Sequence, residues 1–228
     1  MKDTEILNTS FVATKSSGEV SAIYISPQNA KWLLVFAHGA GAGMHHKFME
    51  TASAKLADHR IATFRFNFPY MEKGKRSSDP QPILKKTIRS AVERASELSD
   101  GLPIIAGGKS LGGRMTSMAA SENPIPNVRG LVFFGFPLHA PGKPSAERAD
   151  HLKDVRIPIL FLQGTRDNLA DLKLLKPVCQ KLGEKATLYI AEGGDHSFHL
   201  PKSAGRSDEE VIDELAKKVS EWSEKLRD

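Results

Sequence analysis

The stretch Gly107-Gly108-Lys109-Ser110-Leu111-Gly112-Gly113 decides how this chain is expected to fold. It directly follows the apolar run Leu102–Ala106 and contains the pattern G-x-S-x-G at Gly108, Ser110 and Gly112. This pattern is typical of a sharp turn from a buried strand into a helix, which strains the central serine and lifts its hydroxyl out of the sheet. Because roughly one chain in ten of this length would carry the pattern by chance, the surrounding sequence has to support it.

Strand and helix patterns alternate along the rest of the chain. An opening hairpin is predicted around Ser16-Ser17-Gly18, and the later apolar runs are short, as in strands buried on both faces. Repeated strand–helix units with short connections predict an α/β fold, with a mostly parallel sheet covered by helices on both faces. The predicted strands are Phe11–Thr14, Val20–Ser26, Trp32–Ala37, Ile61–Phe66, Leu102–Ala106, Gly130–Phe136, Ile157–Leu162 and Ala186–Ile190. The predicted helices are Phe48–Leu56, Ile83–Leu98, Leu111–Ala120, Leu169–Leu182 with an interruption at Pro177, and Glu209–Leu226.

Size and composition favour one domain covering residues 1–228. Hydrophobic residues make up 40% of the chain and charged residues 26%, as in ordinary globular proteins. The longest apolar stretches are too short to span a bilayer, and Met1–Glu5 lacks the apolar centre of a secretory signal. Cys179, the single cysteine, excludes an internal disulfide. We therefore expect a cytoplasmic protein that makes no use of a membrane.

The net charge of +5 raises the question of a nucleic-acid partner. The basic residues are spread among acidic ones, as in Arg206–Asp228, and the densest basic cluster, Lys73–Arg76, is a short loop. A nucleic-acid surface would instead gather cations along one face or one helix. We expect no nucleic-acid partner.

Three reactive residues follow predicted strands in the order Ser110, Asp167, His196. The carboxyl ends of parallel strands meet at one edge of such a sheet, where ligand chemistry gathers. A serine hydroxyl is a weak nucleophile until an imidazole takes its proton, and the imidazole needs a carboxylate to fix its tautomer. The order and placement therefore predict a serine–histidine–aspartate catalytic triad.

Other residues could fill two of these roles. Asp195 and Glu192 are alternative acids, but Asp195 is adjacent to His196 in the sequence and would point elsewhere. His199 is an alternative base. Asp167 could also serve as an ordinary turn former or helix cap before the next helix.

The glycine-rich loop beginning at His38 is expected to stabilise negative charge on a carbonyl oxygen. Two preset backbone N–H groups stabilise such an oxyanion by about 3–4 kcal/mol each. One donor should be Leu111, which follows the serine, and the other should be Ala40, with Gly41 as the next choice. The loop lacks the lysine and the Ser/Thr that a phosphate-binding loop carries after its last glycine.

The sequence predicts neither a metal site nor a cofactor. His45 and His46 are adjacent, so on a helix they would point in different directions, and no H-x-x-x-H pair or nearby Cys/Asp ligand set accompanies them. Transfer of an acyl group through a serine needs no cofactor.

Several segments together resemble the α/β-hydrolase superfamily over nearly the whole chain, and within it small hydrolases of the dienelactone-hydrolase type. That group has eukaryotic relatives that include a subunit of the non-specific-lethal histone acetyltransferase complex. The resemblance implies an eight-stranded sheet whose second strand is antiparallel, with Ser110, Asp167 and His196 as the triad. The segments are HGAGAGMHHKFM (His38–Met49), FRFNFPY (Phe64–Tyr70), GGKSLGGRM (Gly107–Met115), FGFPLHAPGKP (Phe134–Pro144), QGTRD and EGGDHSF.

The same resemblance bears on the substrate. A dienelactone hydrolase would carry cysteine at position 110, so the serine favours esters or thioesters over dienelactone. In this superfamily a lid commonly enters before the acid-bearing strand, and the corresponding segment His139–Arg156 is too short for a large cap. Residues Gly41, Asn67, Tyr70 and His139 are expected to line the open cleft. Lys109 is expected to form a salt bridge rather than touch the substrate.

We therefore expect a serine hydrolase that cleaves small acyl esters or thioesters. The alternative is a non-catalytic interaction scaffold with a hydrolase fold, which the resemblance to a subunit of a large assembly motivates, and the sequence leaves room for a protein partner. A peptidase would need a gate or a substrate-binding domain that a chain of this length does not provide.

Overall fold

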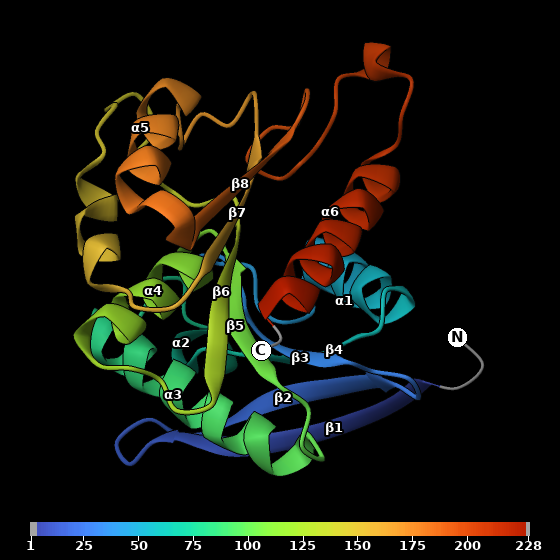
Figure 1. Cartoon of the computed structure of the whole chain (residues 1–228). Coiled ribbons are helices and arrows are strands. Elements are labelled where there is room, and N and C mark those ends of the chain that lie inside the picture. The colour runs from blue at the N-terminus through green and yellow to red at the C-terminus, as the bar shows by residue number, and fades with distance from the viewer. Residues whose placement is uncertain (1–3, 227–228) are drawn as a thin grey trace.

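Eight strands form one sheet in the computed structural model, which describes residues 4–226 (Figure 1). The ends of the predicted domain 1–228, and the first residues of Met1–Glu5, lie outside the described residues. Neighbouring strands follow the order β1-β2-β4-β3-β5-β6-β7-β8. The strands are β1 (Thr4–Thr14), β2 (Gly18–Pro27), β3 (Trp32–Ala37), β4 (Ile61–Phe66), β5 (Ile104–Lys109), β6 (Val128–Phe134), β7 (Ile159–Gly164) and β8 (Ala186–Ala191).

The expected strand directions are confirmed. β2 runs antiparallel to both of its neighbours, β1 and β4. The pairs from β4 through β3, β5, β6 and β7 to β8 are all parallel. The carboxyl ends of β3, β5, β7 and β8 therefore meet at one edge of the sheet, and the loops that leave them can share a site.

Helices cover both faces of the sheet, as the alternating pattern predicted (Figure 1). Helices α1 and α6 pack against each other on one face, over a core that includes Trp32, Phe36 and Phe134. Helices α3, α4 and α5 lie on the other face, over a core that includes Phe64, Phe133 and Phe161. The helices are α1 (Lys47–Asp58), α2 (Pro69–Glu72), α3 (Gln81–Leu98), α4 (Leu111–Glu122), α5 (Leu172–Leu182) and α6 (Asp208–Ser223).

Several strand predictions shift: β1 begins at Thr4 rather than Phe11, and β7 covers Ile159–Gly164 rather than Ile157–Leu162. In β5 and β6 the shift arises because glycines take part in the sheet or end it. β5 runs on through Gly107 and Gly108 to Lys109, beyond the predicted end at Ala106. A β-carbon on Gly107 would lie 1.8 Å from the Val132 carbonyl oxygen, so only glycine allows β6 to approach this closely. β6 ends at Phe134 rather than Phe136, because the next residue, Gly135, turns away at a φ of +71°.

The helix predicted from Leu169 begins at Leu172 and is not interrupted. Asp171 caps it by accepting the Lys173 N–H at 2.8 Å. Pro177 was expected to interrupt this helix, and that prediction is wrong, since α5 continues through it to Leu182. The short helix α2 was not predicted at all; Pro69, at its first position, has a φ already suited to a helix start.

The expectation of no large cap is confirmed. The segment between β6 and β7 contains a β-bridge between Ala140 and Lys143 and the 3-10 helix Glu147–Asp154. Its short helix packs against α4. Within residues 4–226, no helix combines the length and the apolar character that crossing a lipid bilayer requires.

Candidate active site

Ser110 occupies a strained turn between β5 and α4. Its backbone has φ 50° and ψ −113°, a combination that non-glycine residues rarely adopt. The neighbouring glycines make this turn possible: a β-carbon on Gly108 or on Gly112 would lie 2.3 or 2.4 Å from the Ala37 carbonyl oxygen. The turn therefore presents the Ser110 side chain at the carboxyl end of β5, as the G-x-S-x-G pattern predicted.

The structure brings Ser110, His196 and Asp167 into one chain of hydrogen bonds. Nε2 of His196 lies 2.8 Å from Oγ of Ser110, and Nδ1 lies 2.7 Å from Oδ2 of Asp167. Since a carboxylate oxygen can only accept, the ring proton belongs on Nδ1, which leaves Nε2 free to accept from the serine hydroxyl. The three side chains come from the loops after β5, β8 and β7, so the sheet edge assembles them as expected.

The carboxylate of Asp167 is held from several sides. Its side chain is fully buried. Besides His196, Oδ2 accepts the Nε2–H of Gln163 at 2.5 Å, and Oδ1 accepts the backbone N–H of Leu169 at 2.8 Å. The sequence reasoning missed Gln163, although a polar residue at the end of the apolar strand β7 was a visible signal.

The alternative acids and base lie elsewhere. Asp195 accepts the backbone N–H groups of Ser197 and His199 at 2.7 and 2.9 Å and so shapes its own loop. Glu192 is exposed and accepts from the Thr165 hydroxyl at 3.3 Å. The His199 ring is exposed and pairs with Asp208 at 2.7 Å. None of these groups takes part in the hydrogen bonds of Ser110.

Buried side chains hold the glycine-rich loop after β3. His38 lies inside the protein, where its Nδ1–H donates to the Gly39 carbonyl at 2.7 Å and its Nε2 accepts the Phe68 N–H at 3.1 Å. Burial lowers the pKa of His38 to about 4, so the ring is neutral at ordinary pH. The loop runs close to the serine, since a β-carbon on Gly39 would lie 3.7 Å from Cβ of Ser110.

The backbone N–H groups of Leu111 and Ala40 stay the predicted donors toward an acyl oxygen. Leu111 is the first residue of α4, so its N–H has no partner within the helix. Ala40 is exposed in the loop after β3. The N–H of Gly41, the other candidate, donates to the Tyr70 hydroxyl at 3.1 Å. This bond favours Ala40 over Gly41 as the second donor toward an acyl oxygen.

The family follows from comparison with known proteins. Residues 30–224 match the family described as "Alpha/beta hydrolase domain". The chain belongs to this family. The match covers the strands from β3 onward and every loop that contributes to the Ser110–His196–Asp167 chain.

Solved structures of hydrolases share the fold. A dienelactone hydrolase from Anabaena variabilis superposes with a TM-score of 0.76 at 18% identity and covers 98% of both chains. A serine hydrolase without lid from Xanthomonas campestris gives 0.75 at 20% identity, over 96% of this chain and 95% of its own. Sequence identities this low support similarity of fold only.

The predicted relation to a subunit of the histone acetyltransferase complex stays a prediction.

Curated relatives are longer proteins. Two Mycobacterium tuberculosis proteins named "Putative phosphoribosyl transferase" are 25% identical to this protein over 200 residues, which is 86% of the chain. The chain spans only 41% of their length. The name "Putative phosphoribosyl transferase" was given to the whole of each longer protein, of which this chain matches less than half.

The residues expected to line a substrate cleft form hydrogen bonds within and between loops. Asn67 accepts the Met44 N–H at 2.9 Å and donates to Glu72 at 2.9 Å. Tyr70 is buried. His139 is also buried, and its Nδ1 bonds to the Ala140 carbonyl at 3.0 Å. Contact of these residues with a substrate therefore stays a prediction.

No group of three or more side chains able to hold a metal ion occurs within residues 4–226. Cys179, the cysteine noted in the sequence, is half-buried in α5, where burial raises the pKa of its thiol to about 11. A thiol in that state is a poor nucleophile and a poor ligand.

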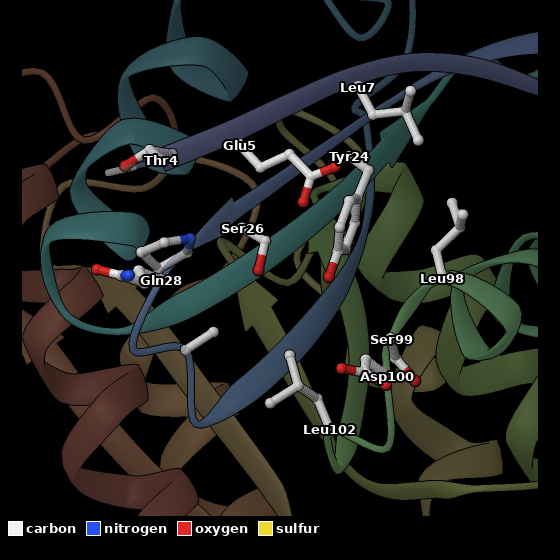
Figure 2. Close-up of a pocket in the computed structure, with 12 residues that line it drawn as sticks. Thr4, Glu5, Leu7, Tyr24, Ser26, Gln28, Leu98, Ser99, Asp100 and Leu102 are labelled. Atoms are coloured by element: carbon white, nitrogen blue, oxygen red, sulfur yellow. The ribbon is translucent and has the colours of Figure 1, made fainter. Parts of the chain in front are cut away.

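A hollow in the structure has a volume of about 720 Å³, and Figure 2 shows the residues that line it. It opens beside β1 and β2, and residues that precede β3 and β5 contribute to it. Ser110 follows the opposite, carboxyl end of β5. The hollow therefore belongs to the other edge of the sheet. The hollow is lined by Thr4, Glu5, Leu7, Tyr24, Ser26, Pro27, Gln28, Ala30, Leu98, Ser99, Asp100 and Leu102.

Proposed function

We propose that this protein is a serine hydrolase that cleaves carboxylic esters or thioesters through an acyl-enzyme on Ser110. The observation that carries the proposal is the unbroken hydrogen-bonded series from Ser110 Oγ through both nitrogens of His196 to the buried carboxylate of Asp167. A serine bonded to a neutral imidazole nitrogen, with a carboxylate on the other nitrogen, is equipped to attack an acyl carbon.

In the proposed reaction, Ser110 Oγ attacks the acyl carbon while His196 Nε2 takes its proton. Asp167 stabilises the imidazolium that forms and keeps the ring in place. The N–H groups of Leu111 and Ala40 stabilise the oxyanion. His196 returns the proton to the leaving oxygen or sulfur. Water then attacks the acyl group by the same sequence of proton transfers and frees Ser110.

The connection between β6 and β7 bears on the proposed substrate class. The segment that could supply a lid forms only a β-bridge and a short 3-10 helix, Glu147–Asp154. An uncovered site suits small or flexible acyl groups, because little apolar wall is available to desolvate a long chain.

The decisive comparison is between the wild-type protein and Ser110→Ala. We expect the wild type to turn over p-nitrophenyl acetate and to react with a fluorophosphonate probe, and the variant to do neither. A matched control is Ser197→Ala, because Ser197 is exposed in the histidine loop and its hydroxyl is outside the proposed reaction. A panel of short and long acyl esters and thioesters then separates the two leaving-group classes. Unchanged probe labelling in Ser110→Ala would defeat the proposal, and a wild type inert to every acyl probe would favour the interaction scaffold.

A further inference from the structure

Lys109 immediately precedes the proposed nucleophile and is buried, with 8% of its surface exposed. As the last residue of β5 it extends into the face of the sheet covered by α1. Among residues 4–226 its ammonium pairs with no carboxylate, contrary to the expected salt bridge, and Nζ donates to the backbone carbonyl of His196 at 2.5 Å. The prediction of a salt bridge was wrong because the histidine loop, not a carboxylate, closes over the side chain.

Two aromatic rings hold the ammonium in place. Nζ lies 5.8 Å from the centre of the Phe48 ring in α1 and 5.7 Å from that of Phe198 in the histidine loop. The two rings stack, with centres 5.9 Å apart and planes 19° apart. A cation near aromatic faces gains some electrostatic attraction, which partly replaces its lost hydration.

Gly135 leaves room for the contact. A β-carbon at this position would lie 3.1 Å from Lys109 Nζ and 3.4 Å from His196 Nδ1. The ammonium and the imidazole are therefore close neighbours, separated by a residue without a side chain. The carboxylates that act on the ammonium are those of Asp167 and Asp195.

A buried cation without a contacting carboxylate is costly, and an apolar side chain of the same length would fill this slot without that cost. What the charged lysine provides, and an apolar side chain would not, is a strong hydrogen bond to the His196 carbonyl. Other bonds of the histidine loop are internal, as from Phe198 N–H to Asp195 O, lead to the acid loop, as from Gly193 N–H to Thr165 Oγ1, or lead to Asp208 at the start of α6, as from Leu200 N–H. Lys109 links the histidine to the strand that carries Ser110.

We propose that Lys109 is a positioning residue whose charged ammonium anchors the main chain of His196, so that the imidazole stays within reach of the Ser110 hydroxyl. The inference rests on the proposed hydrolase reaction. Small displacements of a catalytic group lower the rate far more than they lower substrate binding. Lys109 therefore acts on kcat through His196 and touches no reacting atom.

The test compares Lys109→Met, Lys109→Arg and the wild type in p-nitrophenyl acetate turnover and thermal unfolding. We expect Lys109→Met to unfold at or above the wild-type temperature, because it removes a buried charge. Its kcat should nevertheless fall by about 10- to 100-fold, with KM within about two-fold, since only the proton-transfer geometry changes. Lys109→Arg retains a cation and its donors and should recover part of the loss. Lys31→Met, at a half-exposed surface position, is the matched control and should leave kcat unchanged.

A pH profile adds a measurement that does not depend on a variant folding. Burial lowers the pKa of Lys109 to about 8, with Asp167 and Asp195 opposing that shift. The wild-type kcat should therefore decline as the pH rises through about 8, and Lys109→Arg, which keeps its charge there, should show no such decline. A folded Lys109→Met with kcat within two-fold of wild type, or a wild-type profile that stays flat from pH 7 to beyond pH 9, would overturn the assignment. In both of these outcomes the wild-type protein still turns over p-nitrophenyl acetate. If the proposed hydrolase function is wrong, the wild-type protein shows no turnover at all, so the two failures are distinguishable.

Discussion

Gln163 donates its side-chain N–H to Asp167 across 2.5 Å, on the same oxygen, Oδ2, that receives His196. A second hydrogen bond fixes the orientation of the Gln163 amide, because its Oε1 accepts the backbone N–H of Phe136 at 3.1 Å. The amide therefore has to present N–H, not oxygen, to the carboxylate. This arrangement holds Oδ2 in the acceptor role that the histidine requires.

Replacing Gln163 with glutamate tests that arrangement. In Gln163→Glu the group facing Asp167 is a second carboxyl, so the two groups either repel each other or share a proton, and Oδ2 is no longer a free acceptor for His196. We expect kcat/KM for p-nitrophenyl acetate to fall by about 100-fold, less than the loss of about 10⁴ seen when a triad aspartate itself is changed. Gln180→Glu, the same change at an exposed site in α5, should leave kcat/KM near wild type. Equal activity of the two variants would mean that Gln163 does not orient the acid.

Much of the fold could be predicted from the sequence because its determinants are local. Apolar runs such as Trp32–Ala37 are buried from end to end in the structure, as strands between two layers of helices must be. The predictions are wrong where tertiary contacts, and not the local sequence, determine where a strand ends or whether a helix continues. Gly107 and Gly108 read as the end of a strand, yet they extend β5, because their missing side chains let β6 and β3 approach. Pro177 reads as a helix breaker, yet it lies exposed in α5, where packing on the rest of the helix outweighs one lost hydrogen bond.

The candidate site shows the same division. Ser110, Asp167 and His196 could be selected because each follows a strand, and strand order decides which loops meet. The roles of Lys109 and Tyr70 could not be predicted in that way. Their partners, the His196 carbonyl and the Gly41 N–H, are backbone groups far away in the sequence. Backbone groups occur at every residue, so no sequence pattern reveals which of them a side chain will meet.

Gly135 offers a test of the crowding beneath His196. Its φ of +71° makes alanine there strained, and a β-carbon would press on Lys109 Nζ at 3.1 Å. Gly142 is the matched control, because it has nearly the same φ, +69°, with nothing within 4 Å of a β-carbon. Both alanine variants should lose about 1–2 kcal/mol of stability from the backbone conformation. Only Gly135→Ala should also lose kcat, by about 10-fold or more.

Chemical unfolding gives the stabilities of both variants, and p-nitrophenyl acetate turnover gives their rates. Parallel loss of activity in Gly142→Ala would mean that backbone strain alone accounts for the effect. Full activity in a folded Gly135→Ala would mean that the space between Lys109 and His196 is not limiting.

Acid should destabilise the protein through His38. Burial lowers the pKa of His38 from 6.5 to about 4, so between these values the unfolded chain binds a proton that the folded chain does not. Stability is therefore lost as the pH falls through that window, by about 2 kcal/mol between pH 7 and pH 5 from this residue. His151, whose pKa is also lowered to about 4 by burial and by nearby Arg114, acts in the same direction.

Urea unfolding of wild type and His38→Phe at pH 7 and pH 5 isolates the contribution of His38. Phenylalanine keeps a ring beside Phe68 but cannot bind a proton, so the variant should lose about 2 kcal/mol less than wild type on acidification. At pH 7 it should already be weaker by about 1–3 kcal/mol for each buried partner left without a hydrogen bond, the Gly39 carbonyl and the Phe68 N–H. His45→Phe, at an exposed histidine, serves as the control and should keep the wild-type pH dependence. If His38→Phe loses as much unfolding free energy as the wild type between pH 7 and pH 5, the acid destabilisation comes from protonation of other groups and not from His38.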